Sequence, residues 1–132
     1  MRETFNSVIR VFVEAKELET KDLANQLINL FDQPALNLNI EKYYKFPNWY
    51  EISFQIEQIN TTPNKALEQV GKILGTGWEY NFMDTDDDFS SYAVWSIDKN
   101  STFVNDSVKF ANLETFPLNQ ENIPEEEYST LD

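Results

Sequence analysis

Alternating hydrophobic and polar residues predict the first two strands of the chain. In residues 7–15, Ile9, Val11 and Val13 fall on one side of an extended segment. Arg10 and Phe12 fall on the other side. A shorter alternation covers residues 36–41, where leucine and isoleucine alternate with asparagine and glutamate. We therefore expect two strands here.

The third predicted strand, residues 49–57, has the most regular pattern in the protein. Large side chains recur at every second position and are expected to face the core: Tyr50, Ile52, Phe54 and Ile56. Trp49, Glu51 and Glu57 then face the opposite side of the sheet. Further strands are expected at residues 78–82 and 91–97. Residues 103–115 fit either a last strand or a helical segment.

Two amphipathic helices are expected between these strands. Thr20 is suited to cap a helix over residues 21–32, which Pro34 ends. Thr62 followed by Pro63 starts the second helix, and the glycines at 75 and 77 allow the chain to leave it. The predicted apolar stripes are Leu23, Leu27, Leu30 and Phe31 in the first helix, and Leu67, Val70, Ile73 and Leu74 in the second.

The order of these elements predicts an α+β fold. Strand, helix, strand, strand, helix, strand is the order of a ferredoxin-like split βαβ two-layer sandwich, here extended by one or two extra strands. Both helices then cover one face of the sheet and leave the other face open. We expect a single domain over residues 1–116 and an acidic, flexible tail over residues 117–132, which has no hydrophobic period.

The negative charge is concentrated in the second part of the chain. Of the 23 acidic residues, 13 lie between Glu79 and Asp132, together with only two of the ten basic residues. That stretch therefore carries −11 of the net charge of −13. Bare nucleic acid and anionic membranes would be repelled, so we expect neither as a direct partner. A basic protein is the expected partner.

The residue types that are missing narrow the chemistry. Without histidine there is no Ser-His-Asp arrangement and no imidazole metal site, and without cysteine there is no disulfide or thiolate site. We therefore expect a non-enzymatic protein without a cofactor. Neither a signal-like apolar segment nor a long apolar span occurs, so a cytoplasmic location is expected.

An aspartate run is the most acidic local feature: Asp84, Asp86, Asp87 and Asp88. Its spacing resembles the start of a calcium loop. Such a loop needs glycine at its sixth position and glutamate at its twelfth, where this chain has Phe89 and Trp95. Calcium is therefore disfavoured. A solvated hairpin turn and an acidic tip that binds a partner both remain open.

Aromatic residues next to carboxylates form the second candidate site. Tyr43, Tyr44 and Trp49 lie near a turn or on the outward face, with Glu51 and Glu57 as flanking carboxylates. Such a surface can bind lysine and arginine through cation–π contacts and ion pairs. The alternative is that these rings only cover the sheet edge or hold the tail.

This acidic, histidine-free α/β domain, with aromatics beside carboxylates, resembles the immunity proteins of bacterial toxin systems. Residues 108–114, Val-Lys-Phe-Ala-Asn-Leu-Glu, look like the closing strand of such domains. The resemblance is to immunity proteins of contact-dependent growth inhibition and other polymorphic toxins. It implies a cytoplasmic inhibitor that occludes the active site of a cognate, basic toxin domain, often a nuclease.

Other functions also fit the sequence. The chain could be a DNA mimic or a regulatory adaptor that blocks a nucleic-acid-binding protein, although its carboxylates look clustered along the sequence. It could also be a small-ligand-binding ferredoxin-like domain. The open sheet face fits a homodimer interface as well.

Overall fold

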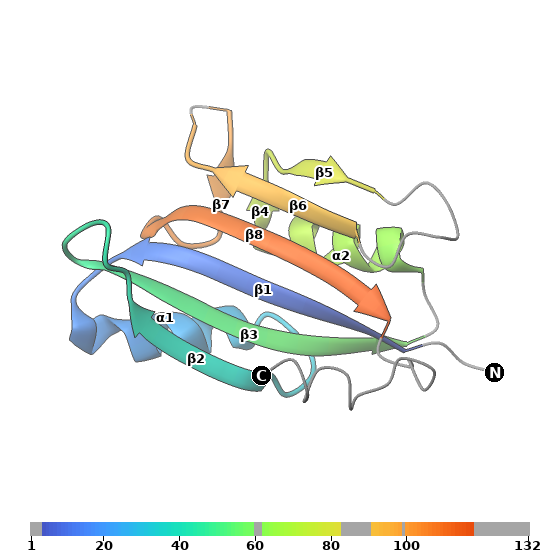
Figure 1. Cartoon of the computed structure of the whole chain (residues 1–132), viewed down its shortest axis with the longest axis horizontal. Helices are drawn as coiled ribbons and strands as arrows, with labels where there is room; N and C mark the ends of the chain where they lie inside the picture. The colour runs from blue at the N-terminus through green and yellow to red at the C-terminus, as the bar shows by residue number, and fades with distance from the viewer. Residues whose placement is uncertain (1–3, 60–61, 83–90, 99, 118–132) are drawn as a thin grey trace, which may run out of the picture.

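Within the residues that the structure describes, the chain forms two helices and eight strands (Figure 1). This computed structural model describes residues 4–59, 62–82, 91–98 and 100–117. The predicted tail therefore lies outside the described residues from residue 118 onward. The helices are α1 (Glu17–Ile28) and α2 (Pro63–Leu74). The strands are β1 (Thr4–Glu14), β2 (Leu36–Lys42), β3 (Trp49–Ile59), β4 (Gly75–Thr76), β5 (Glu79–Asn81), β6 (Ser91–Ser96), β7 (Thr102–Phe103) and β8 (Val108–Pro117).

Six strands form one antiparallel sheet in the order β2-β3-β1-β8-β6-β5. At its centre, β1 pairs with β3 on one side and with β8 on the other. Strands β4 and β7 form a separate two-stranded sheet, which the sequence did not predict. Each of these strands has only two residues, and an alternation of hydrophobic and polar residues cannot be recognised in so short a segment. The α+β class predicted from the sequence is confirmed.

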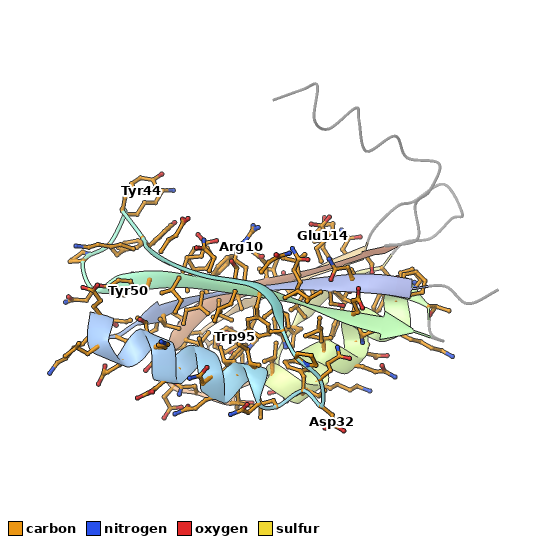
Figure 2. All side chains as sticks on the ribbon, turned by 90° about the horizontal axis from the view of Figure 1, so that it is seen from below. Arg10, Asp32, Tyr44, Tyr50, Trp95 and Glu114 are labelled. Atoms are coloured by element: carbon orange, nitrogen blue, oxygen red, sulfur yellow. The ribbon has the colours of Figure 1, made fainter. Side chains whose placement is uncertain are left out.

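Both helices pack on the same face of the six-stranded sheet, as Figure 2 shows edge-on. The opposite face carries Arg10, Tyr44 and Glu114 and is not covered by either helix. Between sheet and helices lies the core, whose largest fully buried side chains include Phe5, Ile9, Val11, Val13, Leu27, Ile52, Phe54, Leu67, Leu74 and Leu113. The alternation predicted for β3 is confirmed, because Ile52, Phe54 and Ile56 are buried and Tyr50 packs half-buried against the core.

Helix α1 begins earlier than the sequence predicted. Its cap is Lys16, whose backbone N–H donates to the Glu19 carboxylate at 3.0 Å. Thr20 lies inside the helix, and its hydroxyl donates to the Glu17 carbonyl oxygen at 2.8 Å. A threonine in this position bonds to the preceding turn instead of capping the next one. The prediction of a cap at Thr20 was therefore wrong.

The end of α1 also differs from the prediction. The helix stops at Ile28, and Leu30, which was expected in the apolar stripe, is 42% exposed. Phe31 is buried beyond the helix end, where its ring packs edge-on against Phe54 at a centroid distance of 6.2 Å. The ring thus joins the core from the connection to β2.

Helix α2 follows its sequence signals closely. Thr62 caps it by accepting from the Lys65 backbone N–H at 3.3 Å, and Pro63 stands in the first turn. Ile73 is 41% exposed, so its predicted place in the apolar stripe was wrong. Gly77 has a φ of 94°, a conformation that favours glycine in the chain's exit toward β5.

In the described part of the chain, neither helix is long and apolar enough to span a membrane.

The segment that fitted either a strand or a helix forms strand β8 from Val108 onward. Residues 103–115 are not helical, because β8 pairs with β1 and β6 through most of its length. At one edge of the six-stranded sheet, β2 contains a register shift between Leu36 and Asn39, and Asn37 has a φ of 56°. This irregularity leaves Leu36 and Leu38 exposed, at 41% and 43%.

Candidate functional site

The uncovered face of the sheet, called here the open face, is built by the outward positions of β2, β3, β1, β8, β6 and β5. Pairing in register places Phe12 opposite Glu51, Glu14 opposite Trp49, and Arg10 opposite Asn112. Because side chains alternate between faces, these residues share one surface. The sequence-based prediction that Arg10, Phe12, Trp49, Glu51 and Glu57 share the face opposite the helices agrees with this register.

One end of the open face holds an aromatic cluster. Its members are Phe12, Tyr43, Tyr44, Phe46, Trp49 and Phe110. The ring of Phe12 meets Tyr43 edge-on at 5.0 Å and Phe110 at 5.6 Å between centroids. Phe46 and Trp49 lie 4.6 Å apart. These separations are typical of stabilising ring pairs, so the cluster is an ordered surface feature.

The connection between β2 and β3 presents the cluster. The Tyr43 backbone N–H donates to the Trp49 carbonyl oxygen at 2.9 Å, which closes the hairpin. Asn48 has a φ of 66°, a conformation that asparagine tolerates better than most residues. Its carbonyl oxygen accepts from the Ala15 backbone N–H at 2.9 Å, so the hairpin is tied to the end of β1.

The rings of the cluster surround a shallow hollow of about 330 Å³. Its lining residues are Phe12, Tyr43, Phe46, Trp49, Lys109 and Phe110. Most of these side chains are half-buried, whereas Phe46 is 48% exposed. Tyr44 stands outside the hollow, is 85% exposed, and has the Lys45 ammonium 5.9 Å from its ring centroid. A tyrosine this exposed buries little of its own surface against the rest of the protein.

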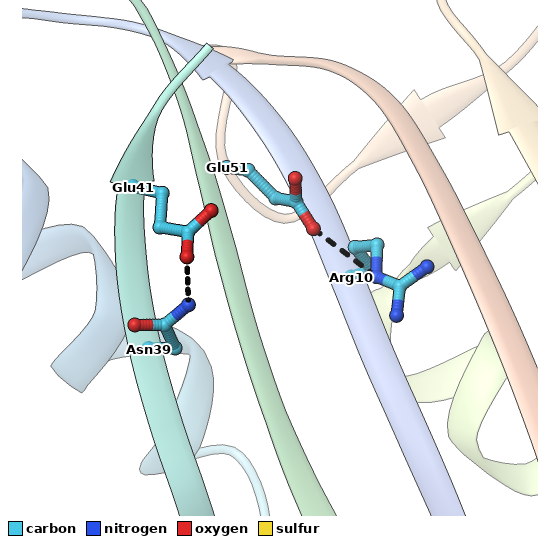
Figure 3. Close-up of polar contacts among 4 residues, drawn as sticks. All are labelled: Arg10, Asn39, Glu41 and Glu51. Atoms are coloured by element: carbon cyan, nitrogen blue, oxygen red, sulfur yellow. Dashed lines mark hydrogen bonds and ion pairs between the residues drawn. The ribbon is translucent and has the colours of Figure 1, made fainter. Parts of the chain in front are cut away.

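Six glutamates share the open face with these rings: Glu14, Glu41, Glu51, Glu57, Glu79 and Glu114. Arg10 Nε lies 3.1 Å from Glu51 Oε2, and Glu41 accepts from the Asn39 side-chain amide at 2.9 Å (Figure 3). The partial exposure of this ion pair means that water and salt weaken it. Glu51 is therefore held in place, with part of its charge compensated.

The helical side of the molecule is nearly neutral by comparison. Residues 16–32 and 63–74 hold five acidic and four basic side chains. On the open face, the six glutamates are opposed by Arg10, by the half-buried Lys109 and by Lys45, whose ammonium lies over the Tyr44 ring. Among the described residues, the excess negative charge thus gathers on the face that the helices leave uncovered.

The structure brings together only part of the predicted site. Tyr43, Tyr44 and Trp49 lie in one cluster, with Glu51 beside it across from Phe12. Glu57 lies six residues further along β3, which is on the order of 20 Å from Glu51, so it cannot belong to the same contact. The aspartates predicted as an acidic tip, Asp84, Asp86, Asp87 and Asp88, lie outside the described residues.

Several members of the surface were missed at the sequence level. Phe46 was not among the predicted site residues, and Phe110 lay in the segment that fitted both strand and helix. Glu79 and Glu114 come from distant parts of the sequence and reach the open face only through the pairing of β5, β6 and β8. An alternation of Phe110, Asn112 and Glu114 was the available signal for two of them.

The described part of the open face offers aromatic rings and carboxylates. Within the part of the chain that the structure describes, no group of three or more acidic side chains is placed to hold a metal ion. Among the described residues, burial and, to a lesser degree, the nearby Glu68 carboxylate raise the pKa of the Tyr80 hydroxyl. Tyr80 packs on the helix side of β5, against α2, and so lies away from the open face.

Comparison of the chain with protein-family models, with curated proteins and with solved structures finds no match.

Proposed function

We propose that this protein binds a basic protein through its open face and thereby inhibits it. The observation that carries the proposal is the coincidence of two features on one surface. A partly exposed aromatic cluster and six glutamates lie on the face without helices, while the helical layer is nearly neutral. Aromatic side chains that can be fully desolvated provide affinity, and the carboxylates around them speed association with a cationic partner.

In this proposal the partner is a toxin domain and the protein is its immunity protein, acting in the cytoplasm without catalysis. A nuclease that binds phosphates has a cleft lined by lysine and arginine. A carboxylate-bearing face with aromatic anchors can cover such a cleft in competition with nucleic acid. Two features support this choice of partner: the negative charge of the open face complements a basic cleft, and the sequence resembles immunity proteins.

The test compares two variants with the same change in charge. In the first, Glu57, Glu79 and Glu114 on the open face become glutamine. In the second, Glu17→Gln, Asp22→Asn and Asp32→Asn neutralise three exposed residues of the helical side. Immobilised wild type and variants are used to capture proteins from native lysate at low and at high salt.

We expect the open-face variant to lose the basic protein that the wild type retains, and the helical-side variant to keep it. The retained protein is then expressed in cells with and without this chain. Protection of the cells would support an immunity function. Equal losses for the two triple variants would contradict the proposed surface, and a retained protein that harms no cell would contradict the toxin.

We also propose that β1, α1, β2, β3, α2 and β8 form a ferredoxin-like split βαβ core. The strand order β2-β3-β1-β8, with both helices on one face, supports this. In that description β6 and β5 are additions beyond β8, and β4 and β7 belong to an insertion between α2 and β8. The additions widen the open face without placing a helix on it.

A DNA mimic is the second candidate function. The glutamates of the open face come from five strands, β1, β2, β3, β5 and β8, and are more widely spread than their sequence positions indicated. A spread of carboxylates can imitate a row of phosphates for a nucleic-acid-binding protein. The capture experiment separates the two functions, because a mimic retains several unrelated DNA-binding proteins and an immunity protein retains one.

A further inference from the structure

The hollow in the aromatic cluster is large enough to admit a long side chain. Its volume of about 330 Å³ corresponds to roughly ten water molecules at ~30 Å³ each. Five rings surround it, from β1, β8, β3 and the β2–β3 connection. The hydrogen bonds that close the hairpin and tie it to β1 hold these rings in place before any ligand arrives.

The faces of aromatic rings attract cations, and two carboxylates lie beside this hollow. Glu51 is the cross-strand neighbour of Phe12, and Glu14 is the cross-strand neighbour of Trp49. Directly opposite residues on antiparallel strands have Cβ atoms about 5 Å apart. A positive group in the hollow would therefore meet ring faces and have carboxylates within reach.

Three cations near the hollow oppose this attraction in part: Arg10, Lys109 and Lys45, which lies over the Tyr44 ring outside the hollow. Arg10 is already paired with Glu51, and the pair uses one oxygen of that carboxylate (Figure 3). Lys109 lines the hollow itself, and its ammonium group would repel a second cation. Neutralising Lys109 should therefore strengthen the binding of a cation in the hollow and weaken the binding of an anion.

We infer that this hollow receives one arginine side chain of the basic partner. The inference rests on the proposed function. It names the partner side chain that the open face binds in this hollow. Arginine is favoured over lysine because the planar guanidinium stacks on ring faces and is more weakly hydrated than an ammonium group. Its N–H groups can at the same time donate to Glu14 or Glu51.

The test uses small probes in place of the partner. The amides of N-acetyl-arginine, N-acetyl-lysine, N-acetyl-citrulline, N-acetyl-phenylalanine and N-acetyl-glutamate are titrated into the ¹⁵N-labelled protein. The indole N–H signal of Trp49 reports occupation of the hollow. The buried Trp78 and Trp95, 9% and 2% exposed, supply internal reference signals. Because one side chain makes few contacts, we expect half-saturation by arginine amide on the order of 10 mM.

We expect the arginine probe to shift the Trp49 signal at the lowest concentration and the lysine probe at a higher one. Citrulline has nearly the shape of arginine without its charge, and we expect it to bind at least about fivefold more weakly. Equal binding of citrulline and arginine would overturn the inference, as would equal binding of lysine. Tighter binding of the phenylalanine or glutamate probe would overturn it too.

Two single-charge variants provide an independent check. Lys109→Gln should tighten arginine binding and Glu14→Gln should weaken it, each by about two- to fivefold, the range of an exposed charge pair. Lys72→Gln on α2 is the matched control and should leave binding unchanged. The remaining ¹⁵N spectrum shows whether each variant is folded. Weaker arginine binding by Lys109→Gln would contradict a cationic occupant.

These measurements can fail separately from the proposed function. If the arginine probe leaves Trp49 unchanged while the open-face variant still loses its basic partner, the hollow is not the anchor and the binding face stands. If the probe binds as expected and both triple variants capture the same protein, the hollow stands and the proposed function fails.

Discussion

Tyr44 offers the sharpest separation between a residue that maintains the fold and one that serves binding. We predict that Tyr44→Ala lowers the stability of the fold much less than the loss of a buried ring does. The side chain is 85% exposed, so its buried remainder is on the order of 30 Å², or about 0.8 kcal/mol at roughly 25 cal/mol per Å². Its contact with the Tyr43 ring, at 5.7 Å, adds about 0.5–1.5 kcal/mol.

The free energy of unfolding should therefore fall by about 1–2 kcal/mol in Tyr44→Ala, measured by urea denaturation. Tryptophan fluorescence can report it, because the variant keeps all three tryptophans. The matched control is Phe54→Ala in β3, which removes a fully buried ring that packs against Phe31. That variant should lose about 3–5 kcal/mol.

For binding of the partner, Tyr44 should matter although its effect on stability is smaller than that of Phe54. If Tyr44 is an anchor, its removal should weaken the affinity for the partner by about 30-fold or more, which corresponds to the ~2 kcal/mol of an interface hot spot. A loss of more than about 3 kcal/mol of stability would show that Tyr44 holds the hairpin together. Unchanged affinity together with unchanged stability would show that the Tyr44 ring contributes neither to binding nor to the fold.

Three further predictions concern the fold around α2. Thr62→Ala removes the acceptor for the Lys65 backbone N–H and should cost about 1 kcal/mol in urea denaturation. Gly71→Ala, which in an exposed helix would stabilise, should instead cost about 1–3 kcal/mol because its Cβ would overlap the Tyr80 hydroxyl, and adding Tyr80→Phe should recover part of the loss. Because the folded state raises the pKa of Tyr80, unfolded chains ionise first, so wild-type stability should fall as the pH rises above about 10. Tyr80→Phe should lose less over that window, and identical pH profiles would contradict the shift.

The regular parts of the fold could be predicted from the sequence because their signals are local. The alternation in β1 and β3 identifies inward and outward residues with no knowledge of their neighbours, and Thr62-Pro63 is a local helix start. α1 shows the limit of such signals. A lysine cap supported by Glu19 has no distinctive sequence, whereas Thr20 imitates a cap and in fact bonds backward to Glu17.

The candidate site was only half predictable because it depends on register across distant strands. Tyr43, Tyr44 and Trp49 are close in sequence, so their proximity could be foreseen. Phe12 and Phe110 meet only because β1 and β8 pair with that register, including the shift between Phe12 and Val13. No pattern within either segment contains this information.

The most direct test of the central claim is to identify which face the captured basic protein covers. Hydroxyl-radical footprinting of the free protein and of its complex compares two exposed side chains on opposite sides, Tyr44 on the open face and Leu18, 90% exposed, on α1. We predict that the complex protects Tyr44 from oxidation and leaves Leu18 as reactive as before. Protection of Leu18 with undiminished oxidation of Tyr44 would contradict the assignment of the open face as the binding surface.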